Sequence, residues 1–182
     1  MPFERNKQPL RPIVRQDIRS LHQEQWVAVP LAQVFDFFSN AENLEKVTPP
    51  WVGFRILTEC PIVMRPGTVI DYEVKIHRIP MRWRSEITEW EPPHYFSDVQ
   101  LKGPYARWNH RHSFRESNGG TLVIDDVEYA LPFSWVPGTG LVERFFVKPE
   151  LDRIFAHRRS ALRTQFGLPP EEKEAPNEEK AQ

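Results

Sequence analysis

Turn signals recur at regular intervals through the middle of this sequence, and they restrict the kind of sheet that the chain can form. Pro66-Gly67, Ile79-Pro80, Pro92-Pro93, Gly103-Pro104 and Asn118-Gly119-Gly120 separate runs of similar length. The runs alternate Val, Ile, Thr, Tyr, Phe and Trp with polar residues, a pattern typical of β-strands. Because a parallel crossover needs about a dozen residues or more, these short connections predict antiparallel neighbours.

The pattern predicts seven strands. Five long strands are expected at residues 68–79, 81–90, 94–102, 105–116 and 121–131, in a meander. A shorter strand is expected before them at 54–59, and another at 20–29.

Helical spacing occurs between the first two strands and again after the last one. Residues 30–39 place apolar side chains at helical spacing behind a proline, and residues 41–47 predict a second short helix. The longest helix is expected at 149–166, with arginines opposite an apolar stripe of Leu151, Ile154, Phe155, Leu162 and Phe166. Residues 141–147, which precede Pro149, are expected to form a separate turn or a kinked segment.

This order of elements predicts an α+β fold in which a curved antiparallel sheet wraps around the C-terminal helix. A long sheet with one polar and one mixed face must cover the mixed face, and only the last helix is long enough to do so. Such an arrangement leaves room for a cavity between sheet and helix.

Composition narrows the classes of function. With 24 basic and 25 acidic residues the chain carries no field that would favour nucleic acid or an anionic membrane as a partner. The single cysteine, Cys60, excludes an internal disulfide and favours the cytoplasm. We find no apolar run of membrane-spanning length and no signal peptide. Residues 1–18 and the acidic 169–182 are interpreted as tails of one domain at 19–168.

Alternation along the strands predicts which side chains face the interior. The inward set mixes apolar and aromatic residues with polar ones. It comprises Ile70, Tyr72, Val74, Ile76, Met81, Trp83, Ser85, Ile87, Phe96, Asp98, Gln100, Trp108, His110, His112, Phe114, Val123, Asp125, Val127, Tyr129 and Leu131.

The polar members of this set need partners, because an unsatisfied buried polar group costs about 1–3 kcal/mol. They could satisfy one another in a structural network, for example Asp98 with His110 or His112. They could instead orient a ligand in a mostly apolar pocket. Catalysis is a narrower form of the second interpretation, with His110 or His112 moving protons beside Asp98.

A metal site and the common catalytic motifs are not expected. His110 and His112 share one strand face, with Glu116 four residues further on, which loosely resembles a cupin metal motif, but a second motif with the required spacing is missing. The sequence contains no glycine-rich dinucleotide loop, no phosphate-binding loop and no Gly-x-Ser-x-Gly elbow. We therefore predict neither a metal nor another cofactor.

Three segments together resemble a known family. They are QEQWVAVPLAQVFDFFSNAENLEKVTPPWVGFRI, RWRSEITEWEPPHYFSDVQLKGPYARWNHRHSF and DDVEYALPF followed by the long helix. They are similar to the START-like helix-grip (SRPBCC) superfamily, in its polyketide cyclase/dehydrase-like and carbon-monoxide-dehydrogenase-subunit-G-like branch, over about residues 20–166. The resemblance implies the helix-grip fold and an internal cavity for lipids, polyketides or other apolar molecules, and some members catalyse cyclisation or dehydration. It implies no particular catalytic residue here.

The leading hypothesis is a protein that binds a small apolar ligand carrying a polar group. The expected ligand-binding residues are Tyr72, Trp83, Phe96, Asp98, Gln100, Trp108, His110, His112, Phe114, Asp125 and Tyr129. The first alternative is a cofactor-independent cyclase, dehydratase or related lyase with His110, His112 and Asp98 as candidate catalytic residues. The second is a protein-interaction module that uses an outer surface of Arg82, Arg84, Arg107 and Arg111.

Overall fold

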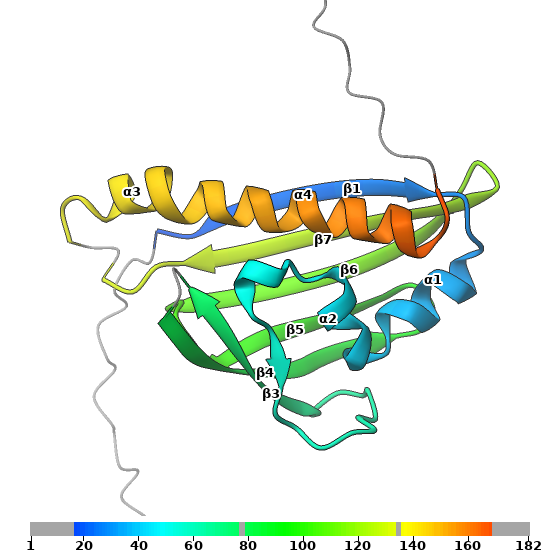
Figure 1. The fold of residues 1–182 in the computed structure, drawn as a ribbon, viewed down its shortest axis with the longest axis horizontal. Helices are drawn as coiled ribbons and strands as arrows, with labels where there is room; N and C mark the ends of the chain where they lie inside the picture. Colours follow the sequence, from blue (N-terminus) through cyan, green and yellow to red (C-terminus); the bar gives the residue numbers. More distant parts are fainter. Residues whose placement is uncertain (1–16, 77–78, 134–135, 169–182) are drawn as a thin grey trace, which may run out of the picture.

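The structure is a computed structural model that describes residues 17–76, 79–133 and 136–168. Within these residues seven strands form one antiparallel sheet in the order β1-β7-β6-β5-β4-β3-β2, and a long C-terminal helix lies across it (Figure 1). The strands are β1 Arg19–Val27, β2 Arg55–Ile56, β3 Val69–Ile76, β4 Ile79–Glu91, β5 Tyr95–Lys102, β6 Arg107–Ser117 and β7 Gly120–Ala130. The helix-grip architecture predicted from the sequence is confirmed. Apart from Asp17 and Ile18, the predicted tails lie outside the described residues.

Two predicted details of the strands are wrong. Ile79 and Pro80 lie in β4, paired with Ile76 and Lys75 of β3, so they do not form the turn. A proline is tolerated there because it is one of the first residues of the strand. The strand predicted at 54–59 is reduced to Arg55–Ile56.

The turn between β6 and β7 follows its sequence signal. Asn118 and Gly119 have φ angles of 50° and 76°, the left-handed conformations that a two-residue hairpin turn requires. Gly120, which follows them, passes so close to the Val27 backbone oxygen and the Trp26 ring that a Cβ atom would collide with both. This turn therefore fixes the register of the two strands that carry the inner histidines and Asp125.

The short helical segments between β1 and β2 pack on the same side of the sheet as the long helix. They are α1 Leu31–Phe38, the 3₁₀ segment η1 Ala41–Asn43, α2 Leu44–Val47 and the 3₁₀ segment η2 Pro50–Val52. Helix α1 contacts β6 and β7, whereas α2 contacts the long helix. In α1 the buried residues Leu31, Val34 and Phe35 join a core cluster with Phe96 and Phe114.

The C-terminal helix begins earlier than predicted. Segments α3 Thr139–Val142, η3 Glu143–Val147 and α4 Lys148–Gln165 follow one another without a break. The η3 segment is π-helical, and the backbone N–H of Lys148 donates to the Glu143 carbonyl five residues earlier. A π-helical turn is wider than an α-helical one, so it accommodates Pro149 inside a continuous helix instead of ending it.

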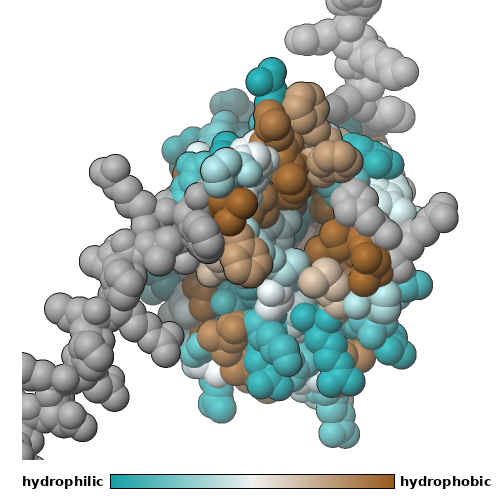
Figure 2. Space-filling view, turned by 90° about the vertical axis from the view of Figure 1, so that its left-hand side faces the viewer, coloured by the Kyte–Doolittle hydropathy of each residue, from teal (hydrophilic) through white to brown (hydrophobic). Residues whose placement is uncertain are grey.

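The two ends of this helix differ in surface character. Leu151, Phe155 and Leu162 of α4 are buried against the sheet. At the α3 end, apolar side chains reach the surface and gather on the face seen in Figure 2. They include Leu141, Val142, Phe145 and Phe146. Among the described residues, no helix combines the length and the apolar character needed to cross a bilayer.

Candidate functional site

A cavity of about 190 Å³ lies between the inner face of the sheet, the short helices and α4. Most of its lining is apolar or aromatic, from both the sheet and the helices. Representative members are Phe38, Val52, Phe54, Ile70, Val74 and Ile154. Polar groups that converge on one part of such a lining are the usual arrangement in small-molecule sites.

Seven of the eleven predicted ligand-binding residues line this cavity. They are Tyr72, Trp83, Phe96, Asp98, Trp108, His110 and His112. They come from β3, β4, β5 and β6, four adjacent strands of the sheet. Period-two alternation thus predicted which of their side chains face inward, whereas their role in binding stays a prediction.

The other four predicted residues face inward or pack beside the cavity without lining it. The Gln100 amide donates to the Tyr105 backbone oxygen at 2.7 Å. Phe114 packs in the core against α1. The Tyr129 hydroxyl donates to Glu143 at 2.8 Å, and burial together with Glu143 raises the pKa of Tyr129. Asp125 lies behind the two histidines, where it contacts both.

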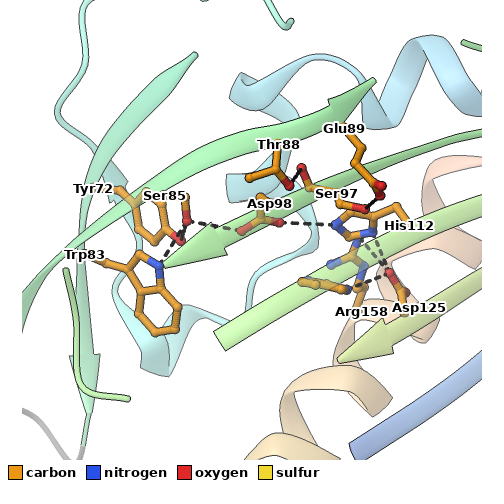
Figure 3. A network of polar contacts seen from close by, with 11 residues as sticks. Tyr72, Trp83, Ser85, Thr88, Glu89, Ser97, Asp98, His112, Asp125 and Arg158 are labelled. Atoms are coloured by element: carbon orange, nitrogen blue, oxygen red, sulfur yellow. Dashed lines mark hydrogen bonds and ion pairs between the residues drawn. The ribbon is translucent and has the colours of Figure 1, made fainter. Parts of the chain in front are cut away.

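Asp125 is the centre of the polar cluster (Figure 3). Its Oδ1 atom lies 2.6 Å from Nδ1 of His112 and 3.1 Å from Nε2 of His110. Nη2 of Arg158, on α4, lies 3.6 Å from the same oxygen. The pairing of Asp98 with His112, expected from the sequence as one example of such a network, is longer: Oδ1 of Asp98 lies 3.9 Å from Nε2 of His112, beyond hydrogen-bond length.

Burial and charge act on these groups in opposite directions. Burial, with help from His110 and Arg158, lowers the pKa of His112 to about 3 despite the neighbouring Asp125 carboxylate. For Asp125, burial alone would raise the pKa, but Arg158 and the two histidines hold it well below its usual range. Burial raises the pKa of Asp98, since the opposing effects of His110, Ser85 and Arg158 offset only part of it. The cluster therefore holds an ionised Asp125 beside a neutral His112.

A second chain of hydrogen bonds reaches Asp98 from the other side (Figure 3). The Trp83 indole N–H donates to Oγ of Ser85 at 3.1 Å, and the Tyr72 hydroxyl lies 3.0 Å from the same atom. Ser85 in turn donates to Oδ2 of Asp98 at 3.2 Å. Burial and the Asp98 carboxylate raise the pKa of Tyr72 well above its usual value, so its hydroxyl stays protonated.

Two members of this site were missed as functional residues. Ser85 was predicted to face inward but was not assigned a role. Arg158 was placed with the arginines on the solvent side of the helix, whereas it lines the cavity. The spacing could have found it, because Arg158 follows Ile154 and precedes Leu162 by four residues each, and residues four apart share a helix face.

Three residues offer donor atoms that suit a metal ion. One ligand-type atom from each of Asp98, His110 and His112 lies within 4.8 Å of the other two. Two imidazoles and a carboxylate are a donor set that first-row transition metals accept. Glu116, the third group considered from the sequence, is not part of this set.

The outer face of the same strands has a different character. Arg84 forms two hydrogen bonds of 2.8 Å to Asp71. Arg107 pairs with Glu128 at 3.0 Å and Arg111 with Glu89 at 3.1 Å. These pairings neutralise much of the predicted arginine surface, so they give no support to the protein-interaction alternative.

The fold and the cavity define this chain as a helix-grip protein. A family model described as polyketide cyclase / dehydrase and lipid transport matches residues 27–156. The chain belongs to this family. The membership supports a ligand-binding or cyclase function in general terms.

Solved structures agree on the fold. The Zhui aromatase/cyclase from Streptomyces superposes with a TM-score of 0.64 at 15% identity, covering 82% of this chain and 94% of that one. A START superfamily protein from Mycobacterium smegmatis gives 0.59 at 16% identity, with 81% and 97% covered. Protein Ms6760 from the same organism gives 0.57 at 19% identity, with 80% and 92% covered. A search of curated proteins finds no match to this sequence.

Proposed function

We propose that this protein binds a small apolar molecule, of the lipid, polyketide or aromatic metabolite class, in the cavity between the sheet and α4. The observation that carries the proposal is the cavity itself, about 190 Å³ of mostly apolar and aromatic lining with Asp98, His110 and His112 on one wall. An apolar cavity of about 150 Å³ suffices to bind benzene in another protein, so the volume suits a compact ligand or one segment of a longer one.

The family description and the fold of the aromatase/cyclase support this proposal. The aromatic rings add to it, because Trp83 lies edge-on to both Tyr105 and Trp108, and it stacks on Tyr72. Rings arranged in this way offer both faces and edges to a flat apolar ligand.

A binding screen tests the proposal directly. Purified protein is examined by native mass spectrometry and by thermal shift against fatty acids, polyketide-like aromatics and simple aromatic compounds. We expect a retained ligand or an increase in melting temperature, since a ligand that binds only the folded state stabilises it. No retained ligand and no shift with any class would contradict the proposal.

A pair of variants on α4 locates the binding site. Ile154→Phe places a larger side chain at a cavity-lining position, whereas Ser160→Phe adds the same ring at an exposed position of the same helix. We expect Ile154→Phe to weaken binding about tenfold or more and Ser160→Phe to leave the affinity unchanged. Equal affinities in the two variants would place the ligand elsewhere.

One observation favours a cyclase or dehydratase as a second candidate. His112 is held by Asp125 through Nδ1, and its other nitrogen faces Asp98 within the cavity lining. In a dehydration, Nε2 of His112 would take the proton from a substrate carbon, the C–O bond would break, and the departing hydroxyl would leave as water with that proton. The electrons of the C–H bond form the new double bond, so no oxidant or reductant is needed.

Replacing His112 separates the two candidates. For an enzyme, His112→Ala removes turnover of an accepted substrate and leaves its binding largely intact. Unchanged turnover in this variant would exclude the catalytic role and leave the binding function standing.

A further inference from the structure

The first turns of the C-terminal helix expose apolar side chains and bury a charged one. Among the described residues of 133–146, six large apolar side chains are exposed, by 39% to 68%. They form one surface, the α3 face, which is seen in Figure 2 and comprises Phe133, Val136, Leu141, Val142, Phe145 and Phe146. Glu143, in the middle of the helical part, is only 4% exposed. A surface helix normally has the opposite arrangement, with its charged residues toward water.

Contacts inside the protein fix the orientation of this helical segment. The Glu143 carboxylate accepts a hydrogen bond of 2.8 Å from the Tyr129 hydroxyl and lies 3.2 Å from Nη1 of Arg19. Val147, four residues after Glu143, packs against the core cluster that contains Tyr129. Residues four apart share a helix face, so Glu143 and Val147 define the inward face and the apolar residues of the α3 face lie opposite. Rotating the helix to cover these apolar residues would break both contacts.

The α3 face is separate from the cavity between the sheet and α4. None of its six residues is among the described residues that line that cavity. Phe133, Val136 and Val142 border instead a shallow apolar hollow on the surface. Contiguous exposed apolar surface of this kind marks a site of contact with a protein or a membrane.

The chain enters the sheet beside the α3 face and brings basic charge with it. Arg19, the first residue of β1, contacts Glu143 of the helical segment (Figure 1). The preceding residues 1–16 contain one acidic residue, Glu4, and four basic ones, Arg5, Lys7, Arg11 and Arg15. Because a chain spans at most about 3.6 Å per residue, the Cα atom of Arg15 lies within about 15 Å of that of Arg19.

The nearly balanced charge of the whole chain conceals this basic segment. Residues 169–182, at the other end of the chain, contain five glutamates and two lysines, and they offset the basic residues of 1–16 in the total. Beside the α3 face itself, Arg19 and Lys148 are paired with acidic neighbours. The guanidinium of Arg144 lies over the ring of the exposed Phe145. The basic excess at this face therefore comes from residues 1–16 and Arg144.

We propose that the α3 face docks on the surface of an anionic phospholipid membrane. Interfacial binding combines the two features found here, because apolar side chains enter the headgroup boundary while Lys and Arg attract anionic lipids. A second copy of the chain fits this face less well, since an isologous contact would bring the two basic segments together. The proposed ligand-binding function does not depend on this surface.

Vesicle co-sedimentation of the full-length protein tests the proposal. One set of vesicles contains phosphatidylcholine alone, and the other contains phosphatidylcholine mixed with phosphatidylglycerol. We expect binding to the mixed vesicles to be about tenfold or more tighter, and added salt to weaken this preference. Replacing two basic residues together, Arg11→Glu and Arg15→Glu, should remove most of the preference.

A second variant and its control test the apolar part of the surface. Phe145→Ser combined with Phe146→Ser should weaken binding to the mixed vesicles about tenfold or more, because less apolar area enters the membrane. Val63→Ser replaces an apolar side chain that is 69% exposed between β2 and β3, and it should leave the affinity unchanged. All of these side chains are exposed where they are described, so the melting temperatures should stay close to that of the wild type.

The outcomes separate this proposal from the ligand-binding function. Absence of binding to the mixed vesicles, or binding that survives both phenylalanine replacements, would overturn docking through the α3 face. A dimer that dissociates in the phenylalanine variant, without vesicle binding, would assign the face to a second copy and overturn the proposal as well. Ile154→Phe, which alters the cavity, should keep vesicle binding. Loss of vesicle binding in that variant would place the lipid contact in the cavity, against the proposal, whereas failure of the ligand screen would leave these expectations unchanged.

Discussion

Two histidine–aspartate pairs lie on opposite faces of the same sheet and have the same length. Nδ1 of His112 lies 2.6 Å from Asp125, and Nδ1 of His22 lies 2.6 Å from Asp126. Asp125 and Asp126 are consecutive residues of β7, so the strand directs one carboxylate inward and the next outward. Any difference between the pairs must come from their surroundings.

The two imidazoles respond in opposite directions. Burial lowers the pKa of His112 to about 3, whereas the hydrogen bond to Asp126 raises the pKa of the exposed His22. In the inner pair Asp125 is shared with His110 and Arg158, and His112 loses the hydration that would support its charge. The comparison shows that the environment, and not the length of the contact, decides whether the pKa of the imidazole in such a pair is raised or lowered.

Removing each carboxylate in turn should give the largest difference in stability between the two pairs. Asp125→Asn leaves the Arg158 charge without its counter-charge in a buried site, and we expect a loss of about 3–5 kcal/mol in the free energy of unfolding. Asp126→Asn, on the exposed face, should cost less than about 1 kcal/mol. Urea denaturation of both variants measures the difference. Similar losses would show that Asp125 is not the centre of a buried network.

Two serines extend the comparison to uncharged groups. Ser85 joins Tyr72, Trp83 and Asp98 in the interior, whereas Ser97 donates to the half-exposed Glu89. Ser85→Ala removes the shared partner of buried groups, so we expect it to cost about 1–3 kcal/mol.

Ser97→Ala is the matched control for this change. It should cost less, because Glu89 keeps its contact with Arg111 and stays open to water. The same denaturation assay compares them, and a larger loss for Ser97→Ala would contradict the inner hydrogen-bond chain.

The fold was largely predictable because local signals agreed with one another. The turn residues at 92–93, 103–104 and 118–120 separate strands whose alternation is clear, and the apolar stripe of the last helix identifies what the sheet covers. The start of the long helix was not predictable from Pro149, since the effect of a proline depends on whether the preceding turn is α- or π-helical. The pairing of Ile79 and Pro80 with β3 likewise depends on register, which composition does not specify.

Alternation predicted the inward face of the site but not its partners. Period two places Asp98, Asp125 and His112 on one face, yet it does not say which of them meet. The two-residue turn at Asn118-Gly119 contains that information, because it pairs Ser117 with Gly120 and so sets His112 opposite Asp125. Asp98 is directly opposite His110 in β5 and β6, but the His110 ring contacts Asp125, and side-chain orientation of this kind is visible only in the structure.

The pH dependence of the free energy of unfolding should show the smallest difference between the two histidines. The folded-state pKa of His112 lies below its unfolded value of 6.5, so below pH 6.5 the unfolded chain binds a proton that the folded protein does not. The free energy of unfolding should therefore fall as the pH drops from 6.5 toward 5, by up to about 1.4 kcal/mol for each pH unit. His22 has the opposite sign, because its raised pKa stabilises the fold at low pH and that contribution disappears as the pH rises through the folded-state pKa. The contribution of His22 is also weaker, since His22 is exposed to solvent and screened.

Denaturation curves at several pH values should show a flatter dependence of stability on pH in His112→Gln than in the wild type, whereas His22→Gln should keep the wild-type slope or make it slightly steeper. A slope that survives His112→Gln would show that His112 is not the group that remains neutral in the folded protein.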